Sequence, residues 1–167
     1  MRAVLFAALL ASGCKIDLDK ADVDANTSGR TCKVSTATVC KEAETMNVSD
    51  FTWIKGKIFA ANCFGSSCHS GSTASGKLDL TDDPYTALMG AGGTGTDSNL
   101  APGHKRVVAG DPAASYLFFI IHGLDDNPGP FSDPPANVGY MPMSNSTLCC
   151  QKIDAIERWI TAGAMNN

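Results

Sequence analysis

The residues that most constrain the fold of this chain lie between positions 62 and 70. Cys63 and Cys68 are separated by four residues, and His69 follows the second cysteine directly. Two cysteines with a histidine directly after the second are typical of covalent haem c attachment, in which the thiols add to the two vinyl groups and the imidazole binds the iron. The pattern therefore predicts one haem c, held by Cys63 and Cys68, with His69 as the proximal ligand of its iron.

The spacing between the two cysteines is wider than usual. Haem c motifs normally have two residues between the cysteines, whereas this chain has four. Two extra residues must bulge out between the thioethers, and Gly65, Ser66 and Ser67 are small enough to allow this. The wider loop leaves two alternatives open: only one thioether forms, or the loop has lost haem and its cysteines form disulfides.

The N-terminal residues resemble an export signal with a lipidation site. Arg2 precedes an apolar run over 4–11 that is too short to span a bilayer, and two small residues stand just before Cys14. Residues 1–13 are therefore expected to be removed and Cys14 to carry lipid, which places the rest of the chain outside the cytosol. Lys15 is not the acidic residue associated with inner-membrane retention, which favours the outer membrane. A plain secretory signal is the alternative.

Cysteine pairing follows from that compartment. An oxidising environment favours disulfides, and if haem takes two cysteines and lipid takes one, four of the seven remain: Cys32, Cys40, Cys149 and Cys150. A bridge between adjacent cysteines is strained, so Cys149 and Cys150 are each expected to bond a different partner. These bonds would tie the N-terminal segment to the C-terminal helix.

Two other uses of the cysteines remain open. Without haem, six cysteines could form three disulfides, with the pair 149–150 bridging the loop cysteines and Cys32 bonded to Cys40. Alternatively, the loop cysteines and His69 could bind zinc together with Cys149 or Cys150. The zinc site is the least favoured, because an adjacent cysteine and histidine are poorly placed to reach one tetrahedral ion and an oxidising compartment competes for thiolates.

Composition predicts one small domain on a polar tether. The net charge is −4 and the sequence has no basic cluster, so nucleic acid is not an expected partner. Residues 15–29 are polar and lack apolar periodicity. Residues 14–49 are therefore interpreted as the lipidated cysteine and a tether that carries Cys32 and Cys40. Residues 50–167 form the folded domain, and because no internal repeat is visible we expect a single haem.

Three segments combine a capping signal with apolar residues at helical spacing: 50–62, 112–122 and 151–162. Asp50 or Ser49 would cap the first, the dipeptide Asp111–Pro112 would start the second, and Gly163 would end the third. The first helix leads directly into the loop of Cys63. Loops rich in glycine and proline join the segments, and no strand pattern is visible, so the predicted fold is a single all-α domain.

An ordered series of short motifs extends the comparison to a known family. The motifs are Gly56–Lys57–Ile58–Phe59, Cys68–His69, Leu78–Asp79–Leu80, Val108–Ala109–Gly110–Asp111–Pro112, Ser115–Tyr116–Leu117, Met141–Pro142, Trp159–Ile160 and Ala162–Gly163–Ala164. Together they resemble the cytochrome c domains of bacterial envelope proteins, the type described as planctomycete-type cytochrome c, over residues 51–164. The resemblance implies a small all-helical, cytochrome c-like fold in which the first and last helices cross beside the haem, with one edge of the porphyrin near solvent.

The same resemblance, together with coordination chemistry, indicates the distal iron ligand. Met141 matches the Met-Pro position of the family, and Pro142 restricts the backbone beside it. A thioether favours ferrous iron and raises the reduction potential, which suits an electron carrier. Met143 is the alternative ligand on the same loop, and either methionine could instead fill a gap in the core.

Other polar residues have weaker links to the haem. His104 lies in a loop with glycine and basic neighbours and is expected to be solvated, with distal ligation as its alternative role. His122 ends an apolar helix, where an imidazole interacts favourably with the helix C-terminus. The basic pair 105–106 could contact a haem propionate, although such pairs are more often surface residues.

These observations predict an extracytoplasmic monohaem c-type cytochrome, anchored by lipid to the outer membrane on its periplasmic side. It would carry single electrons between a donor and an acceptor protein. Enzymatic turnover is not expected, because an iron with two protein ligands has no open position for substrate. The alternative is a haem-free, disulfide-stapled envelope lipoprotein with a binding or structural role on a degenerate cytochrome c fold.

Overall fold

The computed structural model describes residues 32–45, 50–65, 68–122, 130–131, 134–135, 138–143 and 148–167. Over these residues the fold is all-α: no strand is present, and Asp97 and Lys105 form an isolated antiparallel bridge. The elements are α1 (Thr38–Thr45), α2 (Phe51–Ile54), the π-helical segment η1 (Lys55–Phe59), α3 (Ala60–Asn62), the 3₁₀ turn η2 (Ser75–Lys77), α4 (Pro84–Met89), α5 (Tyr116–His122) and α6 (Cys150–Thr161). The expected signal at 1–13, the lipidated Cys14 and the polar spacer at 15–29 lie outside the described residues.

The first predicted helix is confirmed as the continuous run α2–η1–α3. Asp50 caps it, since its Oδ1 accepts a hydrogen bond from the backbone N–H of Trp53 at 2.8 Å. The expected apolar face is buried: Phe51, Ile54, Ile58 and Phe59 all lie in the core. The middle of the run is π-helical, a local widening of the turn that is common near functional sites. The run ends one residue before Cys63.

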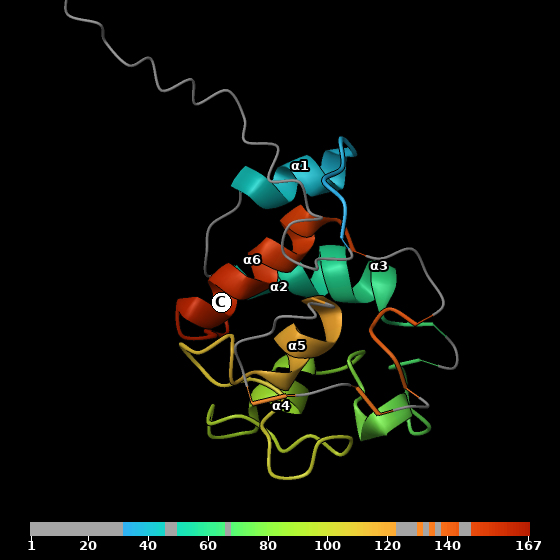
Figure 1. The fold of residues 1–167 in the computed structure, drawn as a ribbon, viewed down its shortest axis with the longest axis vertical. Coiled ribbons are helices and arrows are strands. Elements are labelled where there is room, and N and C mark those ends of the chain that lie inside the picture. The colour runs from blue at the N-terminus through green and yellow to red at the C-terminus, as the bar shows by residue number, and fades with distance from the viewer. Residues whose placement is uncertain are drawn as a thin grey trace, which may run out of the picture.

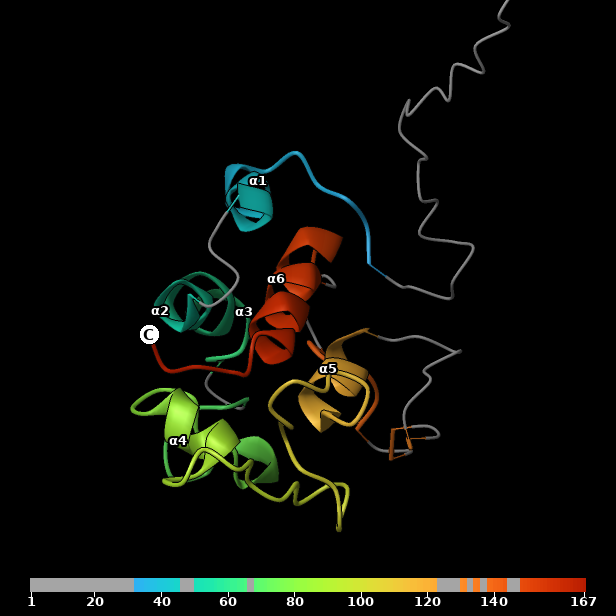
Figure 2. The ribbon, with the colours of Figure 1, turned by 90° about the vertical axis from the view of Figure 1, so that its left-hand side faces the viewer.

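Helix α6 is the central element of the fold. In Figures 1 and 2 it lies between α1 on one side and α5 on the other, and its N-terminal half faces α1. Trp159 is fully buried, and its ring packs on that of Phe51 with the centroids 4.9 Å apart, so α6 meets the start of α2. Gly163 follows the helix with φ at 100°, which glycine tolerates without strain, as its predicted role as a C-cap requires.

Two disulfides join the N-terminal segment to the start of α6. Cys32 bonds Cys150 and Cys40 bonds Cys149, with Cα–Cα distances of 5.1 and 6.4 Å. This confirms that the neighbouring cysteines bond different partners. It contradicts the haem-free pairing in which 149–150 bridge the loop cysteines, and it contradicts a zinc site that uses either of them. The two bonds indicate an oxidising, extracytoplasmic environment.

Polar contacts complete the attachment of α1 to α6. The side-chain amide of Gln151 donates to the backbone oxygen of Ser35 at 2.9 Å and to the carboxylate of Glu44 at 3.1 Å. The guanidinium of Arg158 donates to the carbonyl of Ala43. The segment from Cys32 to Thr45 is therefore packed on the domain through α1, a helix that the sequence analysis did not predict.

The second predicted helix begins later than expected. Asp111 accepts a hydrogen bond from the backbone N–H of Ala114 at 3.0 Å, but this capped turn does not continue, and α5 begins at Tyr116. The first two amides of α5 instead donate to Lys105 and Arg106, at 3.1 and 2.8 Å. These contacts with a distant segment hold the chain out of a continuous helix from Pro112. The helix propensity of residues 112–115 is therefore outweighed by these hydrogen bonds to residues 105 and 106.

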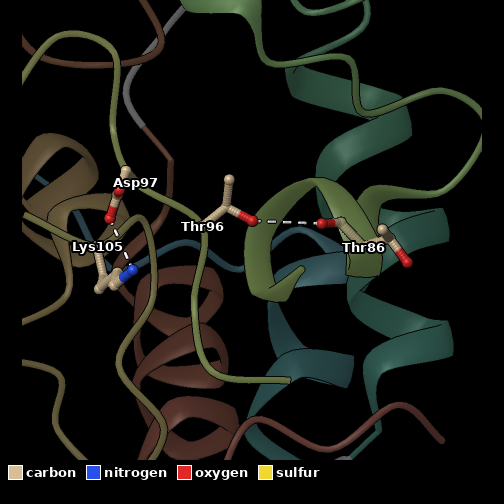
Figure 3. A network of polar contacts seen from close by, with 4 residues as sticks. All are labelled: Thr86, Thr96, Asp97 and Lys105. Atoms are coloured by element: carbon tan, nitrogen blue, oxygen red, sulfur yellow. Dashed lines mark hydrogen bonds and ion pairs between the residues drawn. The ribbon is translucent and has the colours of Figure 1, made fainter. Parts of the chain in front are cut away.

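The dipeptide Asp83–Pro84, which the sequence analysis did not treat as a helix start, begins a helix. Asp83 caps α4, accepting from the backbone N–H of Thr86 at 3.0 Å, and Pro84 is the first helical residue. The loop after α4 is anchored to it, because Thr96 donates from its hydroxyl to the carbonyl of Thr86 at 3.4 Å (Figure 3). Lys105, further along this loop, forms an ion pair with Asp97 at 2.7 Å (Figure 3).

Among the described helices, none has both the length and the apolar character needed to cross a membrane.

Candidate functional site

An apolar cavity of about 190 Å³ lies among most of the elements. A single water needs only about 10–15 Å³ of such space, and close-packed interiors contain few voids larger than one water, so the cavity is far beyond ordinary packing defects. Its lining is mainly aliphatic and aromatic, and includes Ile58, Phe59, Leu78, Leu80, Leu88, Leu117, Ile120, Ile121, Leu148 and Ile156. The motif residues Cys63, Cys68 and His69 lie in its wall, as do Met141 and Met143.

The two loop cysteines are brought into this wall by hydrogen bonds at the base of the loop. The backbone N–H of His69 donates to the carbonyl of Cys63 at 3.1 Å, and that of Cys68 donates to Gly65 at 2.8 Å. The loop therefore closes despite its four intervening residues, of which 66–67 lie outside the described residues. Both cysteines are half-buried and outside disulfides. The structure thus presents two thiols to one cavity.

Gly65 has a steric role in this loop. A Cβ atom built at this position would lie 2.7 Å from the Sγ of Cys68, closer than real Cβ contacts come. A larger residue at Gly65 would therefore displace the thiol or the chain. The sequence analysis assigned Gly65 only the role of letting the loop bulge.

The imidazole of His69 is held in one orientation. Its Nδ1 lies 3.2 Å from the backbone oxygen of Leu78. A carbonyl can only accept, so Nδ1 carries the proton and Nε2 keeps its lone pair. Burial lowers the pKa of His69, and this effect outweighs the opposing hydrogen bond to Leu78. A neutral, oriented imidazole with an available Nε2 is the form in which histidine binds metals.

The thiol of Cys63 is kept protonated at neutral pH. Burial raises its pKa to about 11, the negative charge of a Cys68 thiolate adds to the rise, and Lys152 opposes it. Lys152 is itself buried, and its ammonium donates to the side-chain oxygen of Asn62 at 2.8 Å. Cysteines that bind metals as thiolates have a lowered pKa. The raised pKa of Cys63 is therefore the opposite of what a thiolate ligand of a metal ion would show. Within the described part of the chain, no cluster of three or more His, Cys, Asp or Glu side chains could hold a metal ion.

The two methionines of the predicted ligand loop differ in placement. The backbone N–H of Met141 donates to the carbonyl of Ile120 at 2.8 Å, which attaches the loop to α5, and its side chain is partly buried against the core. Met143 is 63 % exposed. Both line the cavity, and of the two only Met141 is packed against the core.

Comparison of the chain with protein-family models, with curated proteins and with solved structures found no match. The candidate site is therefore described by its own geometry and chemistry.

The remaining histidines lie away from the cavity wall. His104 contacts the ring of Phe131 with centroids 4.8 Å apart, and His122 is buried against Phe118 with centroids 4.6 Å apart. Neither is among the residues that line the cavity. The half-buried position of His104 against Phe131 differs from the solvated side chain that the sequence predicts, whereas His122 ends α5 at the predicted position.

Two polar residues in the cavity wall have no polar role in the sequence analysis beyond the basic pair 105–106. The side chain of Arg106 is buried and lines the cavity. Tyr116 also lines the cavity, and its hydroxyl is buried without a hydrogen-bond partner in the described part of the chain. The signal that could have drawn attention to Arg106 is the pair of valines directly after it, which marks the point where the chain enters the core.

The arrangement combines four sulfur and nitrogen groups with an apolar enclosure. Two thiols can form thioethers, one imidazole nitrogen and one thioether sulfur can bind a metal, and the surrounding side chains are mainly apolar. These donors are the set used by a covalently attached haem with His/Met ligation. By the chemistry of its donors, the site fits haem c.

Proposed function

We propose that this protein is an extracytoplasmic monohaem c-type cytochrome that carries single electrons. The observation behind the proposal is that Cys63, Cys68, His69 and Met141 line one apolar cavity. The first three are close in sequence, but Met141 follows more than seventy residues later, so it is the fold that brings a thioether sulfur to the cavity that the motif lines. The ordered motifs that resemble planctomycete-type cytochrome c domains support the same proposal.

Each of the four residues has a defined role in this proposal. Cys63 and Cys68 would hold haem c through thioethers, His69 would bind the iron through Nε2, and Met141 would bind it through its sulfur. The haem, when bound, supplies a one-electron iron couple whose potential depends on its axial ligands. Met143 is the alternative distal ligand.

The protein environment would tune this couple through the groups already described. The carbonyl of Leu78 fixes the tautomer of His69 and increases the basicity of its Nε2. The apolar wall keeps water from the iron and lowers the local dielectric constant. Because both axial positions are filled by protein atoms, the protein would be an electron carrier and not an enzyme.

The location of this carrier follows from the N-terminal sequence and the disulfides. We infer that residues 1–13 are removed, that Cys14 carries lipid, and that the polar segment 15–29 spaces the domain from the outer membrane on its periplasmic side. Its partners would be the membrane, through the lipid, and redox proteins that donate and accept single electrons. Residues 50–167 would form the cytochrome c-like domain.

The direct test is the mass and colour of the protein purified from the envelope of cells that mature c-type cytochromes. The purified chain is expected to be red, to keep its colour through acid–acetone extraction, and to have a mass that includes one haem, with no free thiol left at positions 63 and 68. A colourless protein with cystine between these positions would contradict the proposal and leave the haem-free lipoprotein.

Replacement of Met141 by alanine is expected to lower the reduction potential and leave the haem attached. Loss of the thioether removes the ligand that favours ferrous iron, and the expected fall is on the order of 0.1 V, within the range of about 0.8 V that axial ligands span. Potentiometric titration measures it. Met143→Ala is the matched control, with an expected change close to zero because its side chain is mostly exposed. The reverse pattern would assign the distal position to Met143.

A further inference from the structure

One wall of the cavity holds a buried cation that lacks a counter-charge. Arg106 is only 8 % exposed and lines the cavity. Its guanidinium donates to three backbone carbonyls, those of Ala87 at 2.7 Å, Lys77 at 3.2 Å and Gly76 at 3.4 Å. Among the described residues no carboxylate pairs with it; the ion pair of this segment belongs to its neighbour Lys105. Neutral carbonyls fix the position of the guanidinium but leave its charge uncompensated.

Burial of an unpaired charge is costly, so such groups are normally paired. A guanidinium has five N–H donors, and three hydrogen bonds leave donors available. The carbonyls of α4 and η2 hold the guanidinium in place, and Arg106 is also one of the residues that line the cavity. A group in the cavity that brings negative charge would complete the site.

A second residue of the cavity wall, Tyr116, also has a polar group without a partner in the part of the chain that the structure describes. Tyr116 is 7 % exposed, and its hydroxyl is a buried polar atom without a hydrogen-bond partner among the described residues. A buried hydroxyl left unsatisfied costs about 1–3 kcal/mol. Tyrosine in a core normally finds a partner for its hydroxyl. This orphaned donor is independent evidence for a missing acceptor.

The backbone places the two groups on adjoining segments. The N–H of Tyr116 donates to the carbonyl of Lys105 at 3.1 Å, and the N–H of Leu117 donates to that of Arg106 at 2.8 Å. The start of α5 is thus bonded directly to the segment that carries Arg106. An unpaired guanidinium and an unpaired phenol on bonded segments of one cavity wall both require an acceptor, and an ionised acceptor satisfies both.

We propose that Arg106 and Tyr116 form a carboxylate subsite in the cavity, which binds the acid group of an otherwise apolar ligand. This identification rests on the proposed function: in a c-type cytochrome, the carboxylate would be a propionate of the haem. The same chemistry would bind the head of a long-chain fatty acid. A guanidinium pairs with a carboxylate through charge-assisted hydrogen bonds, and the phenol adds a third donor. The apolar remainder of the ligand lies against the aliphatic wall.

The test uses the full mature chain produced without haem, titrated with haemin and with haemin dimethyl ester, in which both propionates are blocked. The wild-type chain is expected to bind haemin about tenfold to a hundredfold more tightly than the ester, the range that a charge-assisted hydrogen bond supplies. Arg106→Gln is expected to abolish this preference, and Tyr116→Phe to reduce it severalfold. Equal binding of acid and ester by the wild type, or an unchanged preference in Arg106→Gln, would overturn the subsite.

Lys105→Gln is the matched control, because it removes a cation one residue away that is 43 % exposed and already paired with Asp97. It is expected to keep the full preference for haemin.

Tyr116→Phe shows whether a lost preference is caused by misfolding. Because the hydroxyl has no partner in the ligand-free chain, its loss is expected to leave the ligand-free melting temperature unchanged or higher. Haemin is expected to raise the melting temperature of this variant less than that of the wild type. A drop in the ligand-free melting temperature with an unchanged rise on haemin would assign Tyr116 a purely structural role.

A parallel titration with oleate and methyl oleate separates the two sources of the carboxylate. If the envelope protein carries covalent haem and the preference for haemin over its ester depends on Arg106, both proposals stand. If the envelope protein carries no haem but oleate binds in preference to its ester through Arg106, the subsite stands and the cytochrome proposal fails. If haem is attached but neither acid is preferred over its ester, the subsite fails and the cytochrome proposal stands.

Discussion

Replacement of Cys63 and Cys68 together by alanine is expected to abolish covalent haem attachment. Both thiols lie in the wall of the same cavity and neither forms a disulfide, so they are the groups available for thioethers. The double variant is expected to lose all haem colour on a denaturing gel, while the wild type keeps it. Haem staining and the intact mass of the purified chain measure the result.

The single variants decide whether the widened loop forms one thioether or two. Cys63→Ala and Cys68→Ala are each expected to keep haem through the remaining sulfur, at reduced yield, because the base of the loop is closed by backbone bonds that do not need the thiols. If one single variant matches the wild type in yield and haem absorption, only the other cysteine forms a thioether. If the double variant keeps haem through denaturation, attachment occurs elsewhere and the proposal is wrong.

Removal of the bond between Cys32 and Cys150 is expected to lower the free energy of unfolding substantially. The bond between Cys40 and Cys149 still joins the same two segments, so the bond between Cys32 and Cys150 closes a further loop of only about ten residues, which stabilises the fold by about 2–3 kcal/mol. Domains of this size have only about 5–15 kcal/mol in total. The double variant Cys32→Ser, Cys150→Ser is therefore expected to unfold at a clearly lower denaturant concentration, measured by circular dichroism in guanidinium chloride.

Val34→Ser serves as the control for this variant. It changes a residue of the same segment that is 70 % exposed, and is expected to leave the free energy of unfolding unchanged. No residue of the described segment 32–45 lines the cavity. Haem attachment is therefore expected to survive loss of the bond wherever the domain remains folded. Equal unfolding midpoints for wild type and double variant would show that the packing of α1 on α6 and the bond between Cys40 and Cys149 are sufficient without the bond between Cys32 and Cys150.

Capping residues and apolar spacing in the sequence predicted the helices that depend mainly on neighbouring residues. The capping carboxylate of Asp50 and the apolar spacing after it predicted the run α2–α3, and the spacing over 151–162 with Gly163 predicted α6. The π-helical turn within the first run could not be predicted, since it depends on how side chains pack against the rest of the fold. The prediction that the adjacent cysteines bond separate partners also followed from local geometry.

Two identical dipeptides show where local signals fail. Asp83–Pro84 starts α4, whereas Asp111–Pro112 starts only a turn. Both aspartates cap a backbone N–H three residues on, so the local chemistry is the same. The difference arises after the turn, where the amide of Tyr116 bonds the distant carbonyl of Lys105. A sequence pattern does not specify such a long-range competitor.

The sequence by itself determined the reactive groups of this protein: two cysteines and a histidine in one loop, a methionine beside a proline, and four further cysteines for an oxidising compartment. Only the tertiary structure decided that the methionine shares a cavity with the loop, that Cys32 bonds Cys150, and that Arg106 is buried. The physical reason is that the kind of functional group is fixed by the residue type, whereas its neighbours, its burial and therefore its pKa are fixed only when segments far apart in the chain pack into one core.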